Sequence, residues 1–434
     1  MKTTRLYSAT AIFVAACVGP ADVSKGPGEP GADPTFTLRE ERAWAGGTIR
    51  IHATGVAKTH GTLEARVGTL PAGMTRMDDS TFVLDVPKES SGSQPVTIAG
   101  GGESFEAGTV QVAGFDSWTM IDLSAVSYSM LPLEDPTDAV VALTSVAGLE
   151  LINLSAGTRV SYPAYRPDCM VAPNPSYRPG VVTIDDDQGV VHALQYDHAS
   201  KGLVSLGPTE AGCGRHVMEI GPQVFMKLFN HTGQIVRLPG AAPVDQPAED
   251  FQVEDADAVV MSPARNRATM QPSSALQGLP VFSSPEGELA YRIPDVVYLD
   301  RVTFSPDGDQ LALVYKPDQG VGSRVLRIYD ALTGSPIHER ALEGTDLVFG
   351  LTYDPVRPLL YLVSADSETG RISLEVRRTG DLGAVGRMDA PDNAPPCGYS
   401  YCYSATLVQG SGPVIYFVLA HGDVKILRFN LLDE

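Results

Sequence analysis

The chain has 434 residues, with 32 lysines and arginines against 52 aspartates and glutamates, so its formal net charge is −20. Such an acidic surface repels phosphate backbones and anionic headgroups, which excludes nucleic acid as an expected partner. Hydrophobic residues make up 43% of the chain, too many for a disordered protein. The 43 glycines and 33 prolines disfavour long helices. The length predicts two or three domains.

The first 16 residues have the pattern of an export signal. Lys2 and Arg5 form a positive region, and an apolar stretch runs from Leu6 to Ala16. That stretch is shorter than the ~20 residues needed to span a bilayer, but it suits a signal peptide. No other hydrophobic run in the sequence approaches a membrane-spanning length. We therefore expect residues 1–16 to be a signal peptide.

The signal ends in Val14-Ala15-Ala16-Cys17, which resembles the lipobox of bacterial lipoproteins. The resemblance implies cleavage before Cys17, which then carries the lipid and is the only attachment to the membrane. The alternative is an ordinary secretory signal in which Cys17 is incidental. Residues 17–34 are rich in Gly and Pro and predict a flexible tether. We expect an exported protein anchored in the bacterial cell envelope, with the outer membrane favoured over the inner.

Four further cysteines remain for the folded part. If Cys17 carries the lipid, Cys169, Cys213, Cys397 and Cys402 form an even set, which favours two disulfides in an oxidising compartment. Of the three possible connectivities we favour Cys397–Cys402 with Cys169–Cys213. A metal site at Cys213 and His216 is the alternative, but no second close pair of ligands has zinc spacing. We therefore expect no metal.

Residues 35–114 predict a small β-sandwich. Alternating apolar and polar residues recur in short stretches bounded by Gly, Pro and Ser, as in 48–53 (TIRIHA) and 81–86 (TFVLDV). The order resembles immunoglobulin-like domains of the IPT/TIG type, carried by Gly46-Gly47-Thr48-Ile49-Arg50-Ile51, Val83-Leu84-Asp85-Val86-Pro87 and Pro95-Val96-Thr97-Ile98. The resemblance implies a spacer or protein-binding module, and it assigns no functional residue. We expect Trp44 to be a core or edge aromatic.

Residues 115–434 predict a β-propeller, most clearly near the C-terminus. A strand, the turn Ser305-Pro306-Asp307-Gly308 and two further strands are followed by similar units at 351–376 and 405–429. Four-stranded units that repeat every 40–50 residues indicate blades, because a single small sheet cannot bury both of its faces. The turn resembles WD40-like repeats of the PD40 type, which occur in Tol-associated periplasmic propellers. Those proteins place an α/β domain before their blades, which argues against a Tol-like role here.

Earlier units are more diverged. They are expected at 139–160, 181–206, 216–238 and 258–292. At about 45 residues a blade, the span predicts about seven blades, with six or eight left open. Propellers commonly close by completing one blade from both ends of the chain. Residues 118–127 (WTMIDLSAVS) are the candidate for the strand that pairs with the last blade. The predicted fold class is therefore all-β, a small sandwich followed by a propeller.

The sequence assigns no catalytic or cofactor-binding residue. It has no Gly-x-Ser-x-Gly elbow, phosphate-binding loop or His-Glu-x-x-His pair. The acidic run at 185–189 lacks the ligand spacing of an EF-hand, so a solvated hairpin turn is favoured over a calcium site. His192 and His198 have no common metal spacing, and the other six histidines are scattered.

These observations favour a non-catalytic scaffold that binds another envelope protein or a polymer through its propeller, without a cofactor. The alternative is a propeller enzyme of the lactonase, lyase or quinoprotein class. That alternative requires His, Asp, Glu or Arg side chains gathered at one mouth of the central channel.

Overall fold

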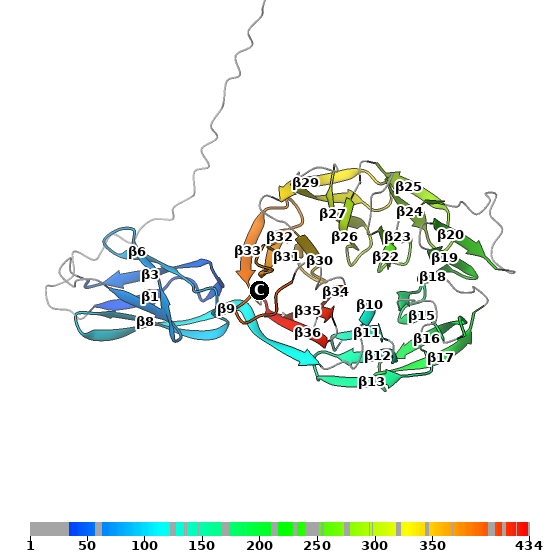
Figure 1. Cartoon of the computed structure of the whole chain (residues 1–434). Helices are drawn as coiled ribbons and strands as arrows, with labels where there is room; N and C mark the ends of the chain where they lie inside the picture. Colours follow the sequence, from blue (N-terminus) through cyan, green and yellow to red (C-terminus); the bar gives the residue numbers. More distant parts are fainter. Residues whose placement is uncertain are drawn as a thin grey trace, which may run out of the picture.

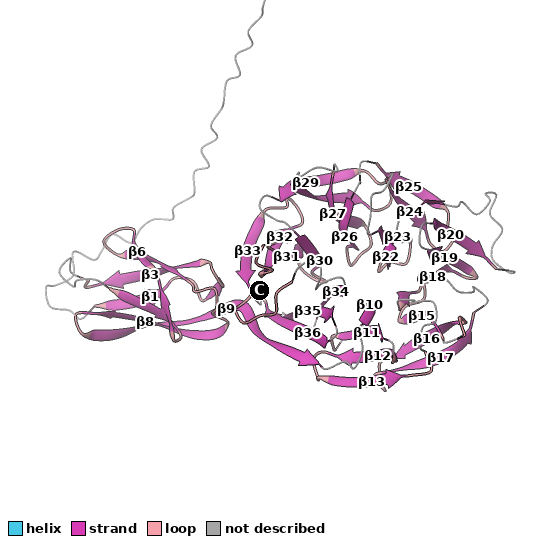
Figure 2. Cartoon of the chain, in the orientation of Figure 1, coloured by secondary structure: helices cyan, strands magenta, loops and turns pink. Residues whose placement is uncertain are grey.

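The protein is described by a computed structural model, and all its regular elements in the described residues are β-strands. The described residues are 34–56, 63–121, 127–133, 135, 137–145, 147–165, 173–186, 188–209, 216–228, 232–238, 251–252, 256–272, 278–294, 296, 298–317, 323–342, 347–366, 368–397, 404–409, 414–421 and 423–432. They form a sandwich beside a ring of blades (Figures 1 and 2). The expected all-β fold class is confirmed.

The sandwich consists of two facing sheets. The first has the order β1 (Thr35–Leu38), β3 (Thr48–Thr54), β7 (Thr81–Asp85) and β6 (Met74–Arg76). The second contains β9 (Glu103–Ile121), β8 (Gly92–Gly100), β4 (Glu64–Val67) and β5 (Leu70–Ala72), with β2 (Arg42–Trp44) parallel to β9. In β3 the alternating side chains of Ile49, Ile51 and Ala53 are buried, which is the expected pattern for a strand with one face toward a core.

The first three blades follow the sandwich, and the first strands of blades 1 and 3 lie nearest the ring centre (Figure 1). Blade 1 contains β10 (Ser127–Leu133), β11 (Val140–Ser145), β12 (Gly148–Asn153) and β13 (Thr158–Tyr162). Blade 2 contains β14 (Asn174–Pro175), β15 (Val181–Asp185), β16 (Val191–Asp197) and β17 (Gly202–Pro208). Blade 3 contains β18 (His216–Gly221), β19 (Val224–Leu228), β20 (Thr232–Arg237) and β21 (Phe251–Gln252).

Four more blades complete the ring. Blade 4 contains β22 (Ala256–Met261), β23 (Arg267–Pro272), β24 (Leu279–Ser283) and β25 (Leu289–Ile293). Blade 5 contains β26 (Tyr298–Phe304), β27 (Gln310–Lys316), β28 (Arg324–Asp330) and β29 (Pro336–Leu342). Blade 6 contains β30 (Leu347–Tyr353), β31 (Leu359–Ala365), β32 (Ile372–Arg378) and β33 (Ala384–Asp389). Blade 7 contains β34 (Ser404–Gln409), β35 (Val414–His421), β36 (Asp423–Asn430) and part of β9.

The described strands thus form seven blades, in agreement with the number expected from the repeat length. The apolar runs of the sequence are the middle strands, which are covered on both faces by neighbouring blades. All seven residues of β31 are buried, for example, whereas four of the five residues of the outermost strand β13 are exposed. This difference explains why the middle strands read as continuous apolar runs and the outer ones as polar strands.

The Ser305-Pro306-Asp307-Gly308 turn joins β26 to β27 as its sequence predicts. Gly308 has a φ of +78°, and its amide donates to the Ser305 carbonyl at 2.9 Å. A Cβ atom at this glycine would lie 2.5 Å from the Cβ of Ala264, in the corresponding turn of blade 4. Glycine is therefore required here both by the left-handed backbone and by the close approach of the neighbouring blade.

The ring closes through β9, which belongs to both parts of the molecule. Its first half pairs with β8 in the sandwich, and residues 114–121 pair antiparallel with β36. The prediction that the segment beginning at Trp118 pairs with the last blade is confirmed for residues 118–121, with Trp118 opposite Leu427. The remaining residues of that prediction, 122–126, lie outside the described part. The domain boundary predicted between residues 114 and 115 falls inside β9.

Candidate functional site

Most residues singled out from the sequence lie outside the described part of the chain. These are the predicted signal peptide (residues 1–16), residues 17–33 of the predicted tether, which include Cys17, and Cys169, Cys213 and Cys402. Cys397 is described and is completely buried. In the described residues no helix is long and apolar enough to cross a membrane, and no three His, Cys, Asp or Glu side chains are grouped as metal ligands.

The acidic run at 185–189 joins β15 to β16, so the hairpin expected there is present. Asp186 accepts hydrogen bonds from the backbone amides of Gln188 and Val190 at 2.9 and 3.0 Å. The expectation of a solvated turn was wrong for Asp185, whose side chain is fully buried at the end of β15. The reason is that β15 is a middle strand, so both of its faces are covered.

Both histidines of this region pair with a carboxylate. His192 Nε2 lies 2.8 Å from Asp186 Oδ2 at the start of β16, and its ring contacts the Tyr165 ring edge to face. His198, just beyond the other end of β16, has Nδ1 3.4 Å from Asp135 Oδ2. The length of β16 places these two pairs on opposite faces of the propeller. They do not form a common site.

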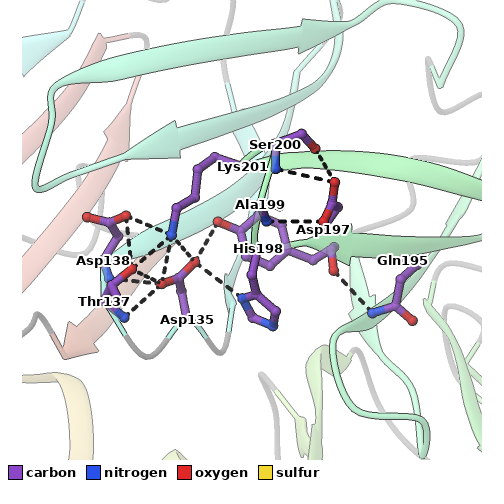
Figure 3. Close-up of polar contacts among 10 residues, drawn as sticks. Asp135, Thr137, Asp138, Gln195, Asp197, His198, Ala199, Ser200 and Lys201 are labelled. Carbon is purple, nitrogen blue, oxygen red and sulfur yellow. Dashed lines mark hydrogen bonds and ion pairs between the residues drawn. The ribbon is translucent and has the colours of Figure 1, made fainter.

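Asp135 is the centre of a polar cluster between blades 1 and 2 (Figure 3). It lies in the turn between β10 and β11, and its side chain has no exposed surface. Lys201, from the β16–β17 hairpin, lies with its Nζ 2.9 Å from both Asp135 Oδ2 and Asp138 Oδ2. The same ammonium donates to Thr137 Oγ1 at 2.9 Å, and the Tyr196 hydroxyl donates to Asp135 Oδ2 at 2.9 Å.

These contacts set the charge state of the cluster. Burial acts to raise the pKa of Asp135, but hydrogen bonds from Lys201, Thr137 and Tyr196 outweigh it and hold that pKa far below its usual range. Burial and the hydrogen bond to Asp135 raise the pKa of the Tyr196 phenol well above its usual value. The carboxylate therefore stays ionised and the phenol neutral, and the cluster is an ionic tie between two blades.

A second cluster, which we call the hub cluster, lies where the innermost strands of blades 2, 3 and 4 contact one another. It consists of Ser176, Tyr177, Arg178, Glu219 and Arg265. Ser176 and Arg178 follow β14, Glu219 lies within β18, and Arg265 lies in the turn after β22. All three segments belong to or adjoin the innermost strands of their blades, so the cluster lies on the inner side of the ring.

Glu219 is the acceptor that holds the hub cluster together. Its Oε2 accepts hydrogen bonds from Ser176 Oγ at 2.7 Å and from Arg178 Nε and Nη2 at 2.9 and 2.7 Å. Its backbone carbonyl accepts from the Tyr177 amide at 2.7 Å. Arg265 Nη1 donates to the Ser176 carbonyl at 3.1 Å and so joins blade 4 to blade 2.

The hub cluster combines a carboxylate, two guanidinium groups, a hydroxyl and a phenol. Burial, together with the negative charge of Glu219, raises the pKa of the Tyr177 phenol. The paired guanidinium and carboxylate groups can orient a polar ligand by hydrogen bonds, and the neutral phenol can donate one. Sequence reasoning missed this cluster, although one signal was present, since a lone Glu interrupts the apolar strand His216–Gly221.

Further hydrogen bonds cross the other blade junctions. Each runs from a side chain of one blade to a backbone carbonyl of a neighbouring blade. The donors and acceptors are Ser284 Oγ to Ile220 O (2.5 Å), Tyr291 Oη to Ala331 O (2.7 Å), Arg301 Nε to Phe349 O (2.7 Å) and Arg357 Nη1 to Leu432 O (2.5 Å). With the two clusters above, the described residues place a polar tie at every junction from blades 1–2 to blades 6–7.

Comparison with known proteins adds little beyond this architecture. No protein-family model matches the chain, and no curated protein matches it. Among solved structures, the crystal structure of the Myceliophteria thermophila Cps50 (Swd1) β-propeller domain is similar, with a TM-score of 0.44 and 10% identity. The match covers 71% of this chain and 99% of that chain. The propeller assignment here follows from the order of the chain's own sheets.

Proposed function

We propose that the protein is an exported, lipid-anchored scaffold of the cell envelope whose propeller binds another envelope protein or a polymer without catalysing a reaction. The observation that carries the proposal is the set of polar ties between blades. Asp135 and Lys201 join turns of blades 1 and 2, and Arg178 joins a turn of blade 2 to Glu219 in strand β18 of blade 3, so the turns that carry these residues are held in place. A rigid loop face binds a large partner with little loss of conformational entropy.

Consecutive hairpins of each blade lie at opposite ends of the strands, so the propeller has two loop faces. Substitutions in hairpins of either kind can therefore test which face binds the partner. Glu286 and Glu288 are exposed in the turn between β24 and β25, on the same face as Asp135. Glu368 is exposed on the other face, in the turn between β31 and β32. We expect capture from detergent-solubilised envelopes to recover a partner, which is then purified and titrated against the full chain.

Charge reversal then locates the interface. We expect either the Glu286→Lys, Glu288→Lys variant or the Glu368→Lys variant to change the dissociation constant at least about tenfold, with the other variant serving as its matched control. Equal effects of both variants would place the interface elsewhere than on a loop face. Failure to recover any partner above a control with the lipid attachment removed would contradict the scaffold proposal.

The anchor is tested separately. The lipobox-like Val14-Ala15-Ala16-Cys17 supports acylation of Cys17, and each buried CH₂ of an acyl chain contributes about 0.8 kcal/mol to membrane binding. We expect Cys17→Ser to abolish labelling by a radioactive fatty acid and to release the protein from washed membranes. Unchanged labelling and retention would contradict a lipid anchor.

We further propose that Cys397 and Cys402 are bridged, with Cys169–Cys213 as the second pair. Support comes from the complete burial of Cys397 and from the four residues between Cys397 and Cys402, which form a loop short enough to be closed by a bridge. Peptide mapping of the exported protein without reduction should recover both pairs.

The resemblance of residues 35–114 to IPT/TIG domains supports a further role of the sandwich as a spacer or protein-binding module.

The hub cluster favours a second candidate function, a propeller enzyme of the lactonase, lyase or quinoprotein class acting at the central channel. It supplies the charged side chains that such a site requires, with Glu219 and Arg178 as its central pair. Activity toward a panel of lactones or uronic-acid polymers that Glu219→Gln abolishes, with the circular dichroism spectrum unchanged, would support it. Activity absent from the wild-type chain, or equal in both proteins, would contradict it.

A further inference from the structure

The sandwich contacts the propeller at two places, and β9 is the first of them. This strand runs without a break from the sandwich into blade 7, where it supplies the outermost strand. Phe115, at the crossing point, packs on Phe429 with ring centroids 3.9 Å apart. Buried apolar residues of the sandwich and of blades 6 and 7 form one continuous hydrophobic cluster. The core of the sandwich is therefore not separate from that of the closing blade.

The second contact is on β33, the outermost strand of blade 6, and we call it the dock. Trp44 of β2 lies so close to Gly386 that a Cβ atom there would be 2.8 Å from Trp44 Cγ. Lys88 Nζ forms an ion pair with Asp389 Oδ2 at 2.7 Å. The Asp389 side chain is only 13% exposed, and Arg387 Nε is also within 3.2 Å of its other oxygen. The absence of a side chain at Gly386 is what allows Trp44 to lie flat on the blade.

The two contacts act on neighbouring blades. β9 pairs with β36 of blade 7, while the dock contacts β33 of blade 6. Strand β2 connects the two contacts, because it carries Trp44 of the dock and pairs with residues 111–113 of β9. Movement of the sandwich away from β33 would carry β2 with it and pull on β9. The only strand that β9 pairs with in the propeller is β36, among the described residues. Strain at the dock is therefore delivered to the strand pair that closes the ring.

We propose that the sandwich is a latch on the propeller, so that its docking on blade 6 and the closure of the ring at β9–β36 form one cooperative unit. A partner or a force that lifts the sandwich from β33 would loosen blade 7 and change the shape of the ring, since the two equilibria are coupled. This coupling depends on the conformation of the chain alone and is the same whichever partner or reaction the propeller serves.

Hydrogen exchange of the full chain, followed by mass spectrometry, tests the latch. Gly386→Val places a branched side chain against Trp44 and should displace the sandwich from the dock. We expect amides of β36 to exchange at least about tenfold faster than in the wild type, because the closing pair opens more often. Amides of β23 and β27, in blades 4 and 5, should stay within about twofold of the wild type.

Three further variants control the experiment. Gly380→Val makes the same change in blade 6 at a position where a Cβ atom meets no other atom within 4 Å, so β36 should exchange as in the wild type. Adding Trp44→Ala to Gly386→Val removes the clash, so the double variant should not exchange faster at β36 than Gly386→Val alone. Lys88→Glu places a carboxylate beside Asp389 at an exposed position, and it should accelerate amide exchange in β36 to a smaller degree. This variant keeps the test available if Gly386→Val fails to fold.

The outcomes separate the alternatives. Faster exchange at β36 confined to the dock variants supports the latch. Faster exchange in β2 with unchanged exchange in β36 would overturn it, because the sandwich would then undock without disturbing the ring. Equal acceleration in all blades would also overturn it, since the substitutions would act by general destabilisation. Exchange unchanged everywhere would show that the dock does not hold the sandwich.

Discussion

Phe115 and Phe429 pack against each other across the seam that closes the ring, although more than three hundred residues separate them in the chain. Their side chains are 7% and 0% exposed, and their strands pair directly at this point. The contact joins the end of the chain to the strand that leaves the sandwich. It therefore belongs both to the closure of the propeller and to the connection between the two parts of the molecule.

We expect Phe429→Ala to be among the most destabilising single substitutions in the chain. Truncation of a fully buried Phe removes apolar burial and leaves a cavity, at a cost of about 3–5 kcal/mol in the free energy of unfolding. Chemical denaturation followed by tryptophan fluorescence measures this loss. Val356→Ala is the control, since Val356 is 89% exposed and should change stability by less than about 0.5 kcal/mol. A loss below about 1 kcal/mol at Phe429 would contradict a close-packed seam.

The tie between blades 1 and 2 predicts a large effect of Asp135→Ala. This substitution removes the acceptor of the Tyr196 hydroxyl and one of the two carboxylates that pair with Lys201, so we expect a clear loss of stability. Asp381→Ala removes an ion pair with Arg378 in which both side chains are exposed, so it should lower stability much less. Thermal unfolding of the two variants should therefore differ clearly, and equal melting temperatures would show that Asp138 and Thr137 hold Lys201 equally well without Asp135.

The lowered pKa of Asp135 predicts an acid-dependent loss of stability. In the unfolded chain this carboxyl titrates near its ordinary value of about 3.9, whereas in the folded chain it titrates lower. Its contribution is therefore fully present above pH ~4 and is lost as the pH falls through the folded pKa. Melting temperatures between pH 7 and pH 2.5 should fall more steeply for the wild type than for Asp135→Asn. Parallel curves would exclude Asp135 as a source of the acid sensitivity.

The hub cluster predicts strong coupling between Glu219 and Arg178. Either single substitution, Glu219→Gln or Arg178→Met, removes one partner of the pair and leaves the other without it. The double variant should therefore be less destabilised than the sum of the single losses, with an interaction energy of about 0.5–3 kcal/mol. A double-mutant cycle from urea denaturation measures this. Additive losses would mean that the ion pair does not tie blade 2 to blade 3.

Local sequence patterns predicted much of the fold, because the strands and turns of most blades are consecutive in the sequence. The apolar run at 359–365 and the turn at Ser305 are read from neighbouring residues, and both occupy the expected places as a middle strand and a hairpin turn. The closing strand at Trp118 was also predictable, because propellers commonly complete one blade with strands that are distant in the sequence. Asp185 was misjudged for the same local reason, since its acidic neighbours indicate a solvated turn although its own strand is covered on both faces.

The sequence by itself determined the all-β class and the succession of a sandwich and about seven blades, because strands alternate with a period of two residues and blades repeat about every 45 residues. It also determined the acidic charge balance, which disfavours nucleic acid and depends on composition alone. Only the tertiary structure decided which charged side chains meet. Glu219 and Arg178 are 41 residues apart, Asp135 and Lys201 are 66 apart, and Lys88 and Asp389 are 301 apart. Such pairs form because the ring brings successive blades and the sandwich together. Local periodicity in the sequence does not predict which distant residues come into contact.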